Sequence, residues 1–348
     1  MIVDNAIFQA FVKLGSFLSN FCDENTKEKS LWDTKLSEAI TIAGHQNGWF
    51  TEDNVLYSLK EWAALLTASN LKEWLSSYPL ENKNPSKTVA IIMAGNIPLV
   101  GFHDFVCVLI TRHKVLAKLS SNDKTLLPFI ADFLIDADSS LEKKIFFTES
   151  KLEKFDAVIA TGSNNTGRYF EYYFGKHPNI IRKNRNSIAV LSGNESKEEL
   201  KALGEDIFRY FGLGCRSVSK LFVPKEYDFA NFYEAIYEYN TVINTNKYAN
   251  NYDYNKAVYL MSDFNLRDNN FLLLKEDNSY GSPIGVLYFE YYNNVKELKE
   301  KLNDDNKQLQ CIVSDASIPK AIPFGSTQHP SLNDYADDID TIEFLLEL

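Results

Sequence analysis

The stretch Thr88-Val-Ala-Ile-Ile-Met93, followed by Ala94-Gly-Asn-Ile-Pro98, decides the fold class of this chain. An uninterrupted apolar run of this length predicts a buried β-strand, and the glycine and proline after it end the strand in a turn. We expect a helix to follow, through about Thr111. Because strands that are covered on both faces are apolar throughout rather than in alternation, the run indicates a parallel sheet.

The neighbouring segments extend this pattern. Apolar strands that alternate with helices are typical of a doubly wound α/β arrangement, which binds ligands at the carboxyl ends of its strands. Amphipathic helices are expected before the sheet, over residues 7–21 and 56–75. Beyond the first strand we expect strands over 114–119, 144–148, 155–161, 220–224 and 284–289, helices over 124–135 and 197–211, and a loop over the Asn- and Tyr-rich residues 237–255.

The composition is that of a globular protein and excludes several classes of function. The chain has 348 residues, 45% of them hydrophobic, which suits two domains and rules out global disorder. Its formal net charge of −11 would repel phosphate backbones, so nucleic-acid binding is not expected as its main task. The most apolar stretch, residues 88–110, contains Asn96, Pro98, His103 and Asp104, so a membrane span is not expected.

The cysteines are few and widely spaced. The four residues Cys22, Cys107, Cys215 and Cys311 form no C-x-x-C pair, which suits neither a disulfide framework nor a zinc site. This spacing fits a reducing compartment, and Met1–Asn5 show no positively charged start of a signal peptide. We therefore expect a cytoplasmic protein without a metal site.

Cys215 is the best candidate for a nucleophile. It follows the end of an expected helix and lies among Gly212, Gly214, Arg216 and Ser217, whereas the other three cysteines lie in apolar segments. Glycines permit a ligand to approach the backbone closely, and a nearby arginine can favour the thiolate. A single cysteine among small residues could equally be an ordinary thiol in a turn.

Two further segments could bind a ligand at strand ends. In Thr161-Gly-Ser-Asn-Asn-Thr-Gly167 a strand runs into a glycine turn and a helix, whose N-terminus could bind phosphate, although a plain strand-to-helix turn explains it as well. Asn96, after the first strand, could donate its amide to an oxyanion or cap the next helix. Lys118 ends another strand, followed by Ser120, and could bind a ribose or be solvated.

The order Asn96, Lys118, Gly162-Ser163 and Cys215 resembles the aldehyde dehydrogenase superfamily. There, an Asn-x-Pro segment precedes a lysine strand, a Gly-Ser turn and a cysteine nucleophile behind a helix. Within the superfamily, the chain is most similar to the LuxC-type acyl-CoA reductase family. Segments that carry this likeness span nearly the whole chain and lie at residues 47–52, 93–99 and 323–344.

The resemblance implies an α/β, aldehyde-dehydrogenase-like fold. This fold combines a Rossmann-type cofactor domain with an α/β catalytic domain, preceded here by an N-terminal helical region. We expect residues 1–205 to form the helices and the dinucleotide-binding domain, and residues 206–325 to form the catalytic domain with the thiol. Residues 326–348 form a C-terminal segment in this scheme.

The resemblance also implies a reaction. Cys215 would take the acyl group from a fatty acyl-CoA or acyl-carrier thioester, and NADPH would deliver hydride to the enzyme-bound thioester. The Asn96 amide and the Cys215 backbone N–H would hold the oxyanion, which collapses to an aldehyde. An acyl-donating partner enzyme is possible. The NADP cofactor would be held by Lys118, Ser120, Gly162, Ser163 and Gly167.

The chain departs from the superfamily where a glutamate normally activates water. Oxidising aldehyde dehydrogenases keep it in a Glu-Leu-Gly-Gly segment upstream of the cysteine. The corresponding stretch here, Ile181-Arg-Lys-Asn-Arg-Asn-Ser187, has no carboxylate, so a thiol is a better acyl acceptor than water. Arg182, Lys183 and Arg185 of this stretch are either a solvated basic patch or attract the phosphates of CoA or NADP.

A second departure concerns the glutamate that binds the nicotinamide ribose in a Glu-x-Phe-Gly-Pro segment. The corresponding stretch here, Asn278-Ser-Tyr-Gly-Ser-Pro283, contains no such glutamate, so the ribose would be held in another way or more loosely. Two histidines could act as acids. His103 lies in an expected helix, which favours a structural role, and the role of His329 is open.

Other readings stay possible at this point. The chain could be a CoA-acylating aldehyde dehydrogenase that works oxidatively, a phosphate-ester reductase, or a non-redox acyl-transfer or scaffold protein on the same fold. The apolar C-terminal segment, residues 335–348, resembles a strand that pairs with a neighbouring subunit in this superfamily. It predicts a homodimer or a larger oligomer, and a tail folded onto its own domain is the alternative.

Overall fold

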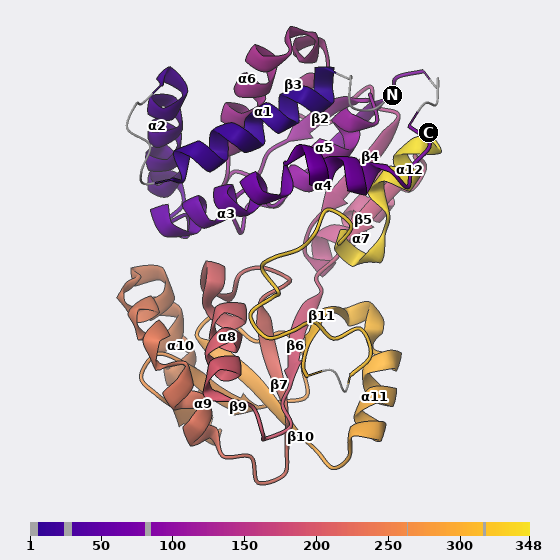
Figure 1. Ribbon diagram of the computed structural model, residues 1–348. Coiled ribbons are helices and arrows are strands. Elements are labelled where there is room, and N and C mark those ends of the chain that lie inside the picture. Colours follow the sequence, from indigo (N-terminus) through magenta and orange to yellow (C-terminus); the bar gives the residue numbers. More distant parts are fainter. Residues whose placement is uncertain (1–5, 24–29, 81–84, 263, 316–317) are drawn as a thin grey trace. The chain divides into compact units, whose positions relative to one another are not determined.

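The computed structural model describes residues 6–23, 30–80, 85–262, 264–315 and 318–348, and its ribbon is drawn in Figure 1. Residues 1–5, which bear on the expectation of no signal peptide, lie outside this set. The chain divides into two compact units: Met1–Lys183 with Ser331–Leu348, and Asn184–Pro330. Among the described residues, no helix is both long and apolar enough to cross a bilayer.

A parallel sheet forms the centre of the first unit. Its strands are β1 (Thr88–Ile92), β2 (Lys114–Lys118), β3 (Ile145–Phe147), β4 (Ala157–Thr161) and β5 (Asn179–Arg182), in the order β3-β2-β1-β4-β5. All of these strand pairs are parallel, which confirms the sheet expected from the apolar runs. The helices of this unit are α1 (Ala6–Phe21), α2 (Leu31–Gln46), α3 (Glu52–Leu65), α4 (Ala68–Leu75), α5 (Phe102–Ile110), α6 (Leu126–Ala137), α7 (Asn164–Phe174) and α12 (Thr341–Leu346).

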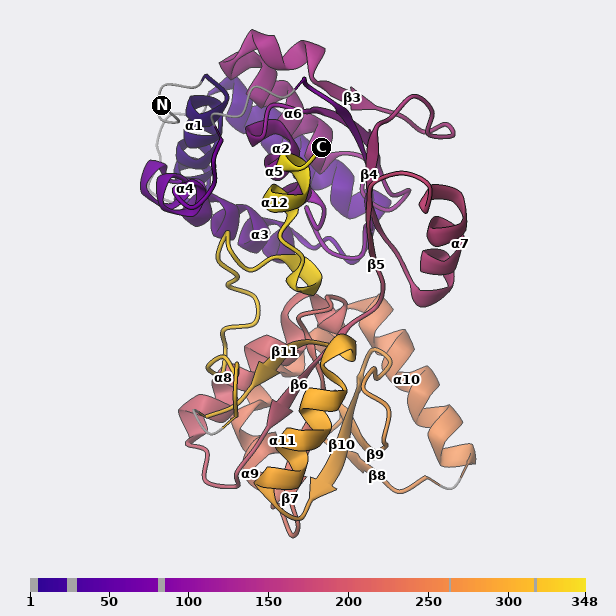
Figure 2. The ribbon, with the colours of Figure 1, turned by 90° about the vertical axis from the view of Figure 1, so that its right-hand side faces the viewer.

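Side chains of β1 alternate between two cores, one on each face of the sheet. Val89 and Ile91 belong to the large core that the N-terminal helices form with α5 and α6. Ala90 belongs to a smaller core, against which Phe170 and Phe174 of α7 pack. Figure 2 shows α7 on one face of this sheet and the N-terminal helices on the other. Burial on both faces is the physical reason why the strand is apolar without alternation.

A buried ion pair joins three elements of the first unit. Arg182 of β5 is 4% exposed and Asp104 of α5 is 5% exposed. The guanidinium contacts both carboxylate oxygens, at 2.5 and 2.9 Å, and donates to the Thr341 hydroxyl of α12 at 3.0 Å. Both expectations for Arg182, a solvated basic patch and a group that attracts phosphates, are therefore wrong, because its charge is buried and paired with Asp104.

The other two basic residues of that stretch have partners as well. Lys183 pairs with Glu171 at 2.7 Å, and both side chains are partly exposed. Arg185 donates to the Leu309 carbonyl at 3.2 Å.

The C-terminal segment folds back onto the first unit as a helix. The expected oligomerisation strand is wrong, because residues 341–346 form α12, which packs against α5. Polar contacts fix the segment: His113 Nε2 lies 2.9 Å from the Leu345 carbonyl, and Tyr78 donates to Asp340 at 2.6 Å. His103 Nε2 lies 3.0 Å from the Leu332 carbonyl, which agrees with a structural role for this histidine.

The second unit has its own sheet, in the order β11-β6-β7-β10-β9-β8. Its pairs are parallel except for β8 with β9. Figure 1 shows α8, α9 and α10 on one face of this sheet and α11 on the other. The elements are β6 (Asn186–Val190), α8 (Lys197–Phe208), β7 (Val218–Pro224), α9 (Phe229–Ala235), α10 (Asn246–Met261), β8 (Leu266–Asp268), β9 (Leu273–Glu276), β10 (Val286–Tyr292), α11 (Val295–Asp304) and β11 (Leu309–Val313).

The expected loop over 237–255 is wrong. Residues 237–244 form a 3-10 helix, and α10 follows. Tyr248, Tyr252 and Asn255 are buried at helical spacing, and each directs its polar end to a partner outside the helix. These partners are the Phe271 carbonyl at 2.9 Å, Asp268 at 2.6 Å and the Ile284 carbonyl at 3.0 Å. Asn and Tyr are weak helix formers, so tertiary contacts outweigh local propensity here.

The observed division of the chain differs from the expected one at both boundaries. We expected boundaries after residues 205 and 325, whereas the chain passes from one compact unit to the other after Lys183 and after Pro330. The first difference arises because β6 lies between β11 and β7 in the second sheet, so that β6 and the following α8 belong to the second unit. The second arises because the segment from Ser331 onward packs on the first unit.

We predict that Asp104→Asn destabilises the first unit strongly. The variant keeps the shape of the side chain but leaves the buried Arg182 charge without its counter-charge, which typically costs about 3–5 kcal/mol. Urea unfolding followed by circular dichroism measures the effect. Glu171→Gln, which breaks the exposed pair with Lys183, is the matched control and should cost less than about 1 kcal/mol. Equal losses in the two variants would contradict the structural role of the buried pair.

Candidate active site

Five of the expected site residues lie at one edge of the first sheet. Strands β1, β2 and β4 end at Ile92, Lys118 and Thr161, and the carboxyl ends of parallel strands share one edge. The chain leaves β1 for β2 on one side, and β4 lies on the other side, so the strand order reverses between β1 and β4. Such a switch point is where open α/β sheets bind their ligands. The structure brings to this edge Asn96, Lys118, Ser120, Gly162 and Ser163.

The Gly162-Ser163 turn leads directly into α7. Ser163 is the N-cap of this helix, and its hydroxyl accepts a hydrogen bond from the Thr166 N–H at 3.2 Å. A Cβ at Gly162 would lie 3.0 Å from side-chain atoms of Phe170 and Thr166, so a larger residue would require these side chains to shift. Gly167 lies one turn further on, where a Cβ would come within 2.8 Å of the Lys183 side chain. Packing against Lys183 therefore accounts for glycine at 167.

The loops after β1 and β2 touch each other. A Cβ at Gly95 would lie 2.5 Å from the Ser120 hydroxyl oxygen, so the loop that carries Asn96 passes directly over Ser120. Asn47, the buried C-cap of α2, donates its amide to the carbonyls of Gly95 and Asn122 at 3.4 and 3.3 Å. Asn47 of the helical region thus holds the loops after β1 and β2 next to each other.

The polar groups of Lys118 and Ser120 have structural partners. The Lys118 ammonium donates to the Ser150 carbonyl at 3.1 Å, in the loop after β3. The Ser120 hydroxyl accepts from the Asn122 N–H at 3.2 Å. Both contacts hold loops at the carboxyl edge of the sheet in place.

Asp123 is a titratable group at this edge that the sequence analysis did not single out. It lines a small cavity together with Met93, Leu99 and Phe102. Burial raises the pKa of Asp123 to about 6, although N–H groups of Leu126, Leu99 and Thr125 stabilise its charged form. Its signal in the sequence is weak, because Ser-Asn-Asp is also a common turn composition.

We predict that Asp123→Asn gains stability relative to the wild type as the pH rises from 5 to 7.5. The carboxyl pKa is about 6 in the folded protein and about 4 when unfolded, so the unfolded state ionises first. Below both pKa values the buried Asp123 carboxyl is neutral. Above both values the folded state must hold a buried charge, so the stability of the wild type falls as the pH rises. Thermal melting of both proteins across this range measures the difference, and parallel pH profiles would contradict it.

Cys215 lies on an exposed turn of the second unit, immediately before β7. Of the four cysteines, Cys215 alone is classed as exposed, whereas Cys22 is half-buried and Cys107 and Cys311 are buried. Burial raises the pKa of the Cys22 thiol, and it raises that of Cys107 well above the usual range. Cys215 is therefore the most accessible thiol.

Two hydrogen bonds hold the turn on either side of Cys215. The Gly214 carbonyl accepts from the Ser217 N–H at 3.0 Å. The Cys215 carbonyl accepts from the Ser187 hydroxyl of β6 at 2.9 Å. Ser187 is not among the site residues expected from the sequence, because nothing in the sequence around β6 indicates a contact with a turn 28 residues away.

The chain enters this turn through a strained backbone. Tyr210, Phe211 and Gly212 all have positive φ, at 54°, 57° and 75°. Left-handed backbone is costly for bulky residues and persists only where the surroundings fix it. Both aromatic rings are buried, and the Phe211 ring lies 6.2 Å from that of Tyr248. Burial of the Tyr210 and Phe211 side chains thus stabilises the sharp change of chain direction between α8 and residues 214–217, the cysteine turn.

A strap formed by residues 323–330 crosses next to the cysteine turn. Asp206 of α8, 0% exposed, accepts the N–H groups of Gly325 and Thr327 at 2.6 and 2.9 Å. On its other side the strap meets the turn, because Arg216 donates to the Thr327 carbonyl and Gln328 donates to the Ser217 hydroxyl. Exposed His329 follows Gln328 in this strap.

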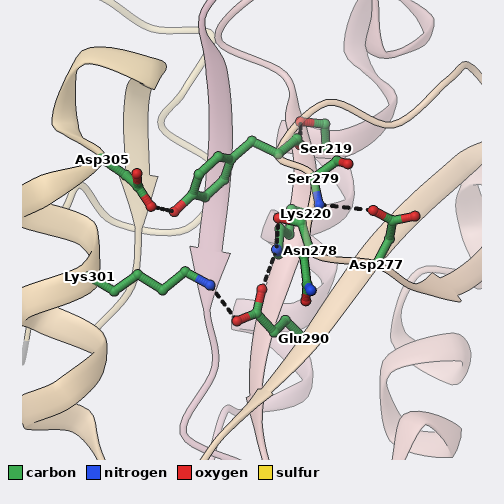
Figure 3. Close-up of polar contacts among 9 residues, drawn as sticks. Ser219, Lys220, Asp277, Asn278, Ser279, Glu290, Lys301 and Asp305 are labelled. Atoms are coloured by element: carbon green, nitrogen blue, oxygen red, sulfur yellow. Dashed lines mark hydrogen bonds and ion pairs between the residues drawn. The ribbon is translucent and has the colours of Figure 1, made fainter.

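The loop that lacks the ribose-binding glutamate is anchored by a buried lysine (Figure 3). Lys220 of β7 is 0% exposed, pairs with Glu290 and donates to the Asn278 carbonyl at 3.0 Å. Burial lowers the pKa of Lys220, and Glu290 opposes that shift. Ser219 donates to the Tyr280 carbonyl at 2.8 Å. These contacts give the loop a fixed path without a carboxylate that projects from it.

We predict that Cys215 is the first thiol to react with iodoacetamide. Burial limits access to the other cysteines and raises the pKa of Cys22 and Cys107, so Cys215 should react roughly tenfold faster or more. Peptide mapping by mass spectrometry after short labelling measures this. Cys215→Ser should lose the fast adduct, and Cys22→Ser should keep it. A fast adduct on another cysteine would contradict the assignment.

Comparison with known protein families and structures places these features in context. A family model described as acyl-CoA reductase (LuxC) matches residues 34–245. No curated protein sequence matches the chain.

Among solved structures, the chain is similar to several aldehyde dehydrogenases. The AldA indole-3-acetaldehyde dehydrogenase of P. syringae, a mutant in complex with NAD+ and IAA, has 14% identity and a TM-score of 0.62 over 92% of this chain and 77% of that chain. An AldC mutant of Pseudomonas syringae, with NAD+ and octanal, has 12% identity and a TM-score of 0.59 over 87% and 71%. The NAD+ complex of an aldehyde dehydrogenase from Bacillus cereus has 12% identity and a TM-score of 0.56 over 90% and 77%.

Identities this low show the fold alone. The chain has the aldehyde dehydrogenase fold, which confirms the fold class expected from the sequence.

Proposed function

The chain belongs to the acyl-CoA reductase (LuxC) family, and we propose that it reduces a fatty acyl-CoA or acyl-carrier thioester to the aldehyde with NADPH. The observation that carries the proposal is Cys215, an exposed thiol on a turn whose flanking peptide groups are both hydrogen-bonded. The other three thiols of the protein are more buried, so we assign the acyl group to Cys215.

The first unit supplies a fitting place for a nicotinamide dinucleotide. Backbone N–H groups at the start of α7 suit a pyrophosphate, and the Gly162-Ser163 turn leads directly into that helix end. Lys118 and Ser120 belong to the same edge of the sheet, at the switch point. We assign the cofactor to Lys118, Ser120, Gly162 and Ser163, with Gly167 supporting the helix rather than touching the ligand. The preference for NADPH over NADH rests on the family resemblance.

The proposed reaction begins with acyl transfer to sulfur. The Cys215 thiolate adds to the thioester carbonyl carbon, and the bond from that carbon to the donor sulfur breaks. The donor leaves as a thiolate and takes up the proton that the Cys215 thiol had lost. When bound, the reduced dinucleotide supplies a hydride to the same carbon. The Asn96 amide and the Cys215 N–H are the proposed donors to the oxyanion. Collapse of this thiohemiacetal oxyanion releases the aldehyde and restores the thiolate.

The absence of a water-activating carboxylate favours reduction over hydrolysis. The stretch 181–187 contains no Asp or Glu, and its first basic residue, Arg182, is engaged with Asp104. Without a base to deprotonate water, the acyl-cysteine persists until a hydride or another thiol reaches it. A CoA-acylating dehydrogenase uses the same residues in the opposite direction.

We further propose a cytoplasmic location and an acyl-donating partner enzyme. Widely spaced free thiols suit a cytoplasmic location, and an acyl-donating partner enzyme is compatible with a thioester substrate. The homodimer predicted from a C-terminal strand loses that basis, because α12 is a helix within the first unit.

We predict that radiolabelled acyl-CoA labels Cys215 and that NADPH converts the label to aldehyde. Labelling follows from the exposed nucleophile, and the conversion from hydride transfer to the acyl-cysteine. Gel fluorography before and after NADPH measures the first, and extraction of the aldehyde measures the second. Cys215→Ser should show neither, and Cys22→Ser should show both.

The outcome distinguishes the alternatives. Label that persists with NADPH would contradict the reductase and indicate an acyl transferase. Absence of any label in the wild type would contradict both and indicate a scaffold.

A further inference from the structure

Ser187 occupies a position that couples the cysteine turn to the buried sheet. It is 0% exposed, in β6. Its hydroxyl accepts the Cys311 N–H of β11 at 3.1 Å and donates to the Cys215 carbonyl at 2.9 Å. A serine hydroxyl has one proton, so acceptance from Cys311 leaves that proton directed at Cys215. The sheet therefore fixes the direction of the hydrogen bond that reaches the turn.

The peptide group on the other side of Cys215 is fixed as well. The Gly214 carbonyl accepts from the Ser217 N–H at 3.0 Å, across the turn. Because a trans peptide is planar, fixing a carbonyl oxygen also fixes the N–H of the next residue, on the opposite side. The first bond thus orients the Cys215 N–H, and the Ser187 bond orients the Cys215–Arg216 peptide.

Together the two hydrogen bonds restrain rotation on both sides of the Cys215 Cα. This sets the direction of the Cα–Cβ bond from which the thiol projects, relative to the N–H of the same residue. Acyl transfer needs both at once, because the sulfur attacks the carbonyl carbon while a donor must meet the carbonyl oxygen. Misplacement by about 1 Å can cost 10²-fold in rate.

We propose that Ser187 is a positioning residue for acyl transfer at Cys215, a role that rests on the proposed function. Its hydroxyl touches neither substrate nor cofactor in this account. It holds the turn so that, as the new C–S bond forms, the carbonyl electron pair moves onto oxygen beside the Cys215 N–H. The pair then returns, the bond to the donor sulfur breaks, and the departing thiolate takes up the proton that Cys215 gave up.

The test compares two reactions of the same thiol in the full-length protein. Acylation by palmitoyl-CoA passes through an oxyanion, whereas alkylation by iodoacetamide displaces iodide and needs no oxyanion donor. Rates at Cys215 are measured for both reagents by quenched labelling and peptide mapping. Circular dichroism melting checks that each variant is folded.

In Ser187→Ala we expect acylation to fall about tenfold or more, with alkylation changed by less than about threefold. Ser314→Ala is the matched control, because it removes another buried serine hydroxyl that donates to β6, at the Val190 carbonyl, 3.0 Å away. Both of its rates should stay at wild-type levels. If Ser187→Ala does not fold, Ser187→Cys decides, since its weaker donor should lower acylation more than alkylation.

Two results would overturn the inference while leaving the proposed function in place. One is wild-type acylation in a folded Ser187→Ala or Ser187→Cys variant. The other is a fall of both rates by the same factor, which is what a purely structural role produces. A wild-type protein that is not acylated at Cys215 would instead overturn the proposed function, and the inference with it.

Discussion

The hydrogen bond from Ser187 to the Cys215 carbonyl ties an exposed thiol to the interior of the second sheet. A nucleophile must be accessible, yet an exposed turn is mobile unless something buried holds it. Here the holding group is the hydroxyl of Ser187, a 0% exposed residue of β6 that also accepts a hydrogen bond from the Cys311 N–H of β11. The strained residues at Tyr210 and Phe211 deliver the chain to this turn, and the strap that Asp206 fixes lies beside it. Accessibility and order are thus combined at one residue.

In each compact unit, buried polar contacts hold together segments that are far apart in the sequence. In the first, Arg182 joins Asp104 and Thr341, so that β5, α5 and α12 share one network. In the second, Lys220 joins Glu290 and the Asn278 carbonyl and fixes the loop before β10 (Figure 3). A buried polar or charged group that loses its partner costs free energy of folding. Each network therefore strongly favours the one arrangement of its loops in which every group is paired. Loops that carry chemistry gain a defined shape from them.

The strands were predictable from the sequence, and most of the contacts that hold the candidate site were not. Apolar runs such as 88–93 reveal strands because burial on both faces leaves a local signature. The helix α10 was missed because its buried residues, Tyr248, Tyr252 and Asn255, are weak helix formers with polar ends. Ser187 and Asp206 were missed because their partners lie far along the chain, and a buried serine or aspartate looks like any other in sequence. Cys215, by contrast, was indicated by its glycine neighbours and its order among the motifs.

In the proposed reaction a single sulfur atom, that of Cys215, carries the acyl group. The most direct measurement is the mass of the peptide that contains residue 215, isolated after incubation with an acyl-CoA and an acid quench. We expect an added mass equal to the acyl group on Cys215, and we expect neutral hydroxylamine to remove it, as it removes the acyl group of a thioester. An acyl group found on a different residue, or an unmodified peptide from an enzyme that still produces aldehyde, would contradict it.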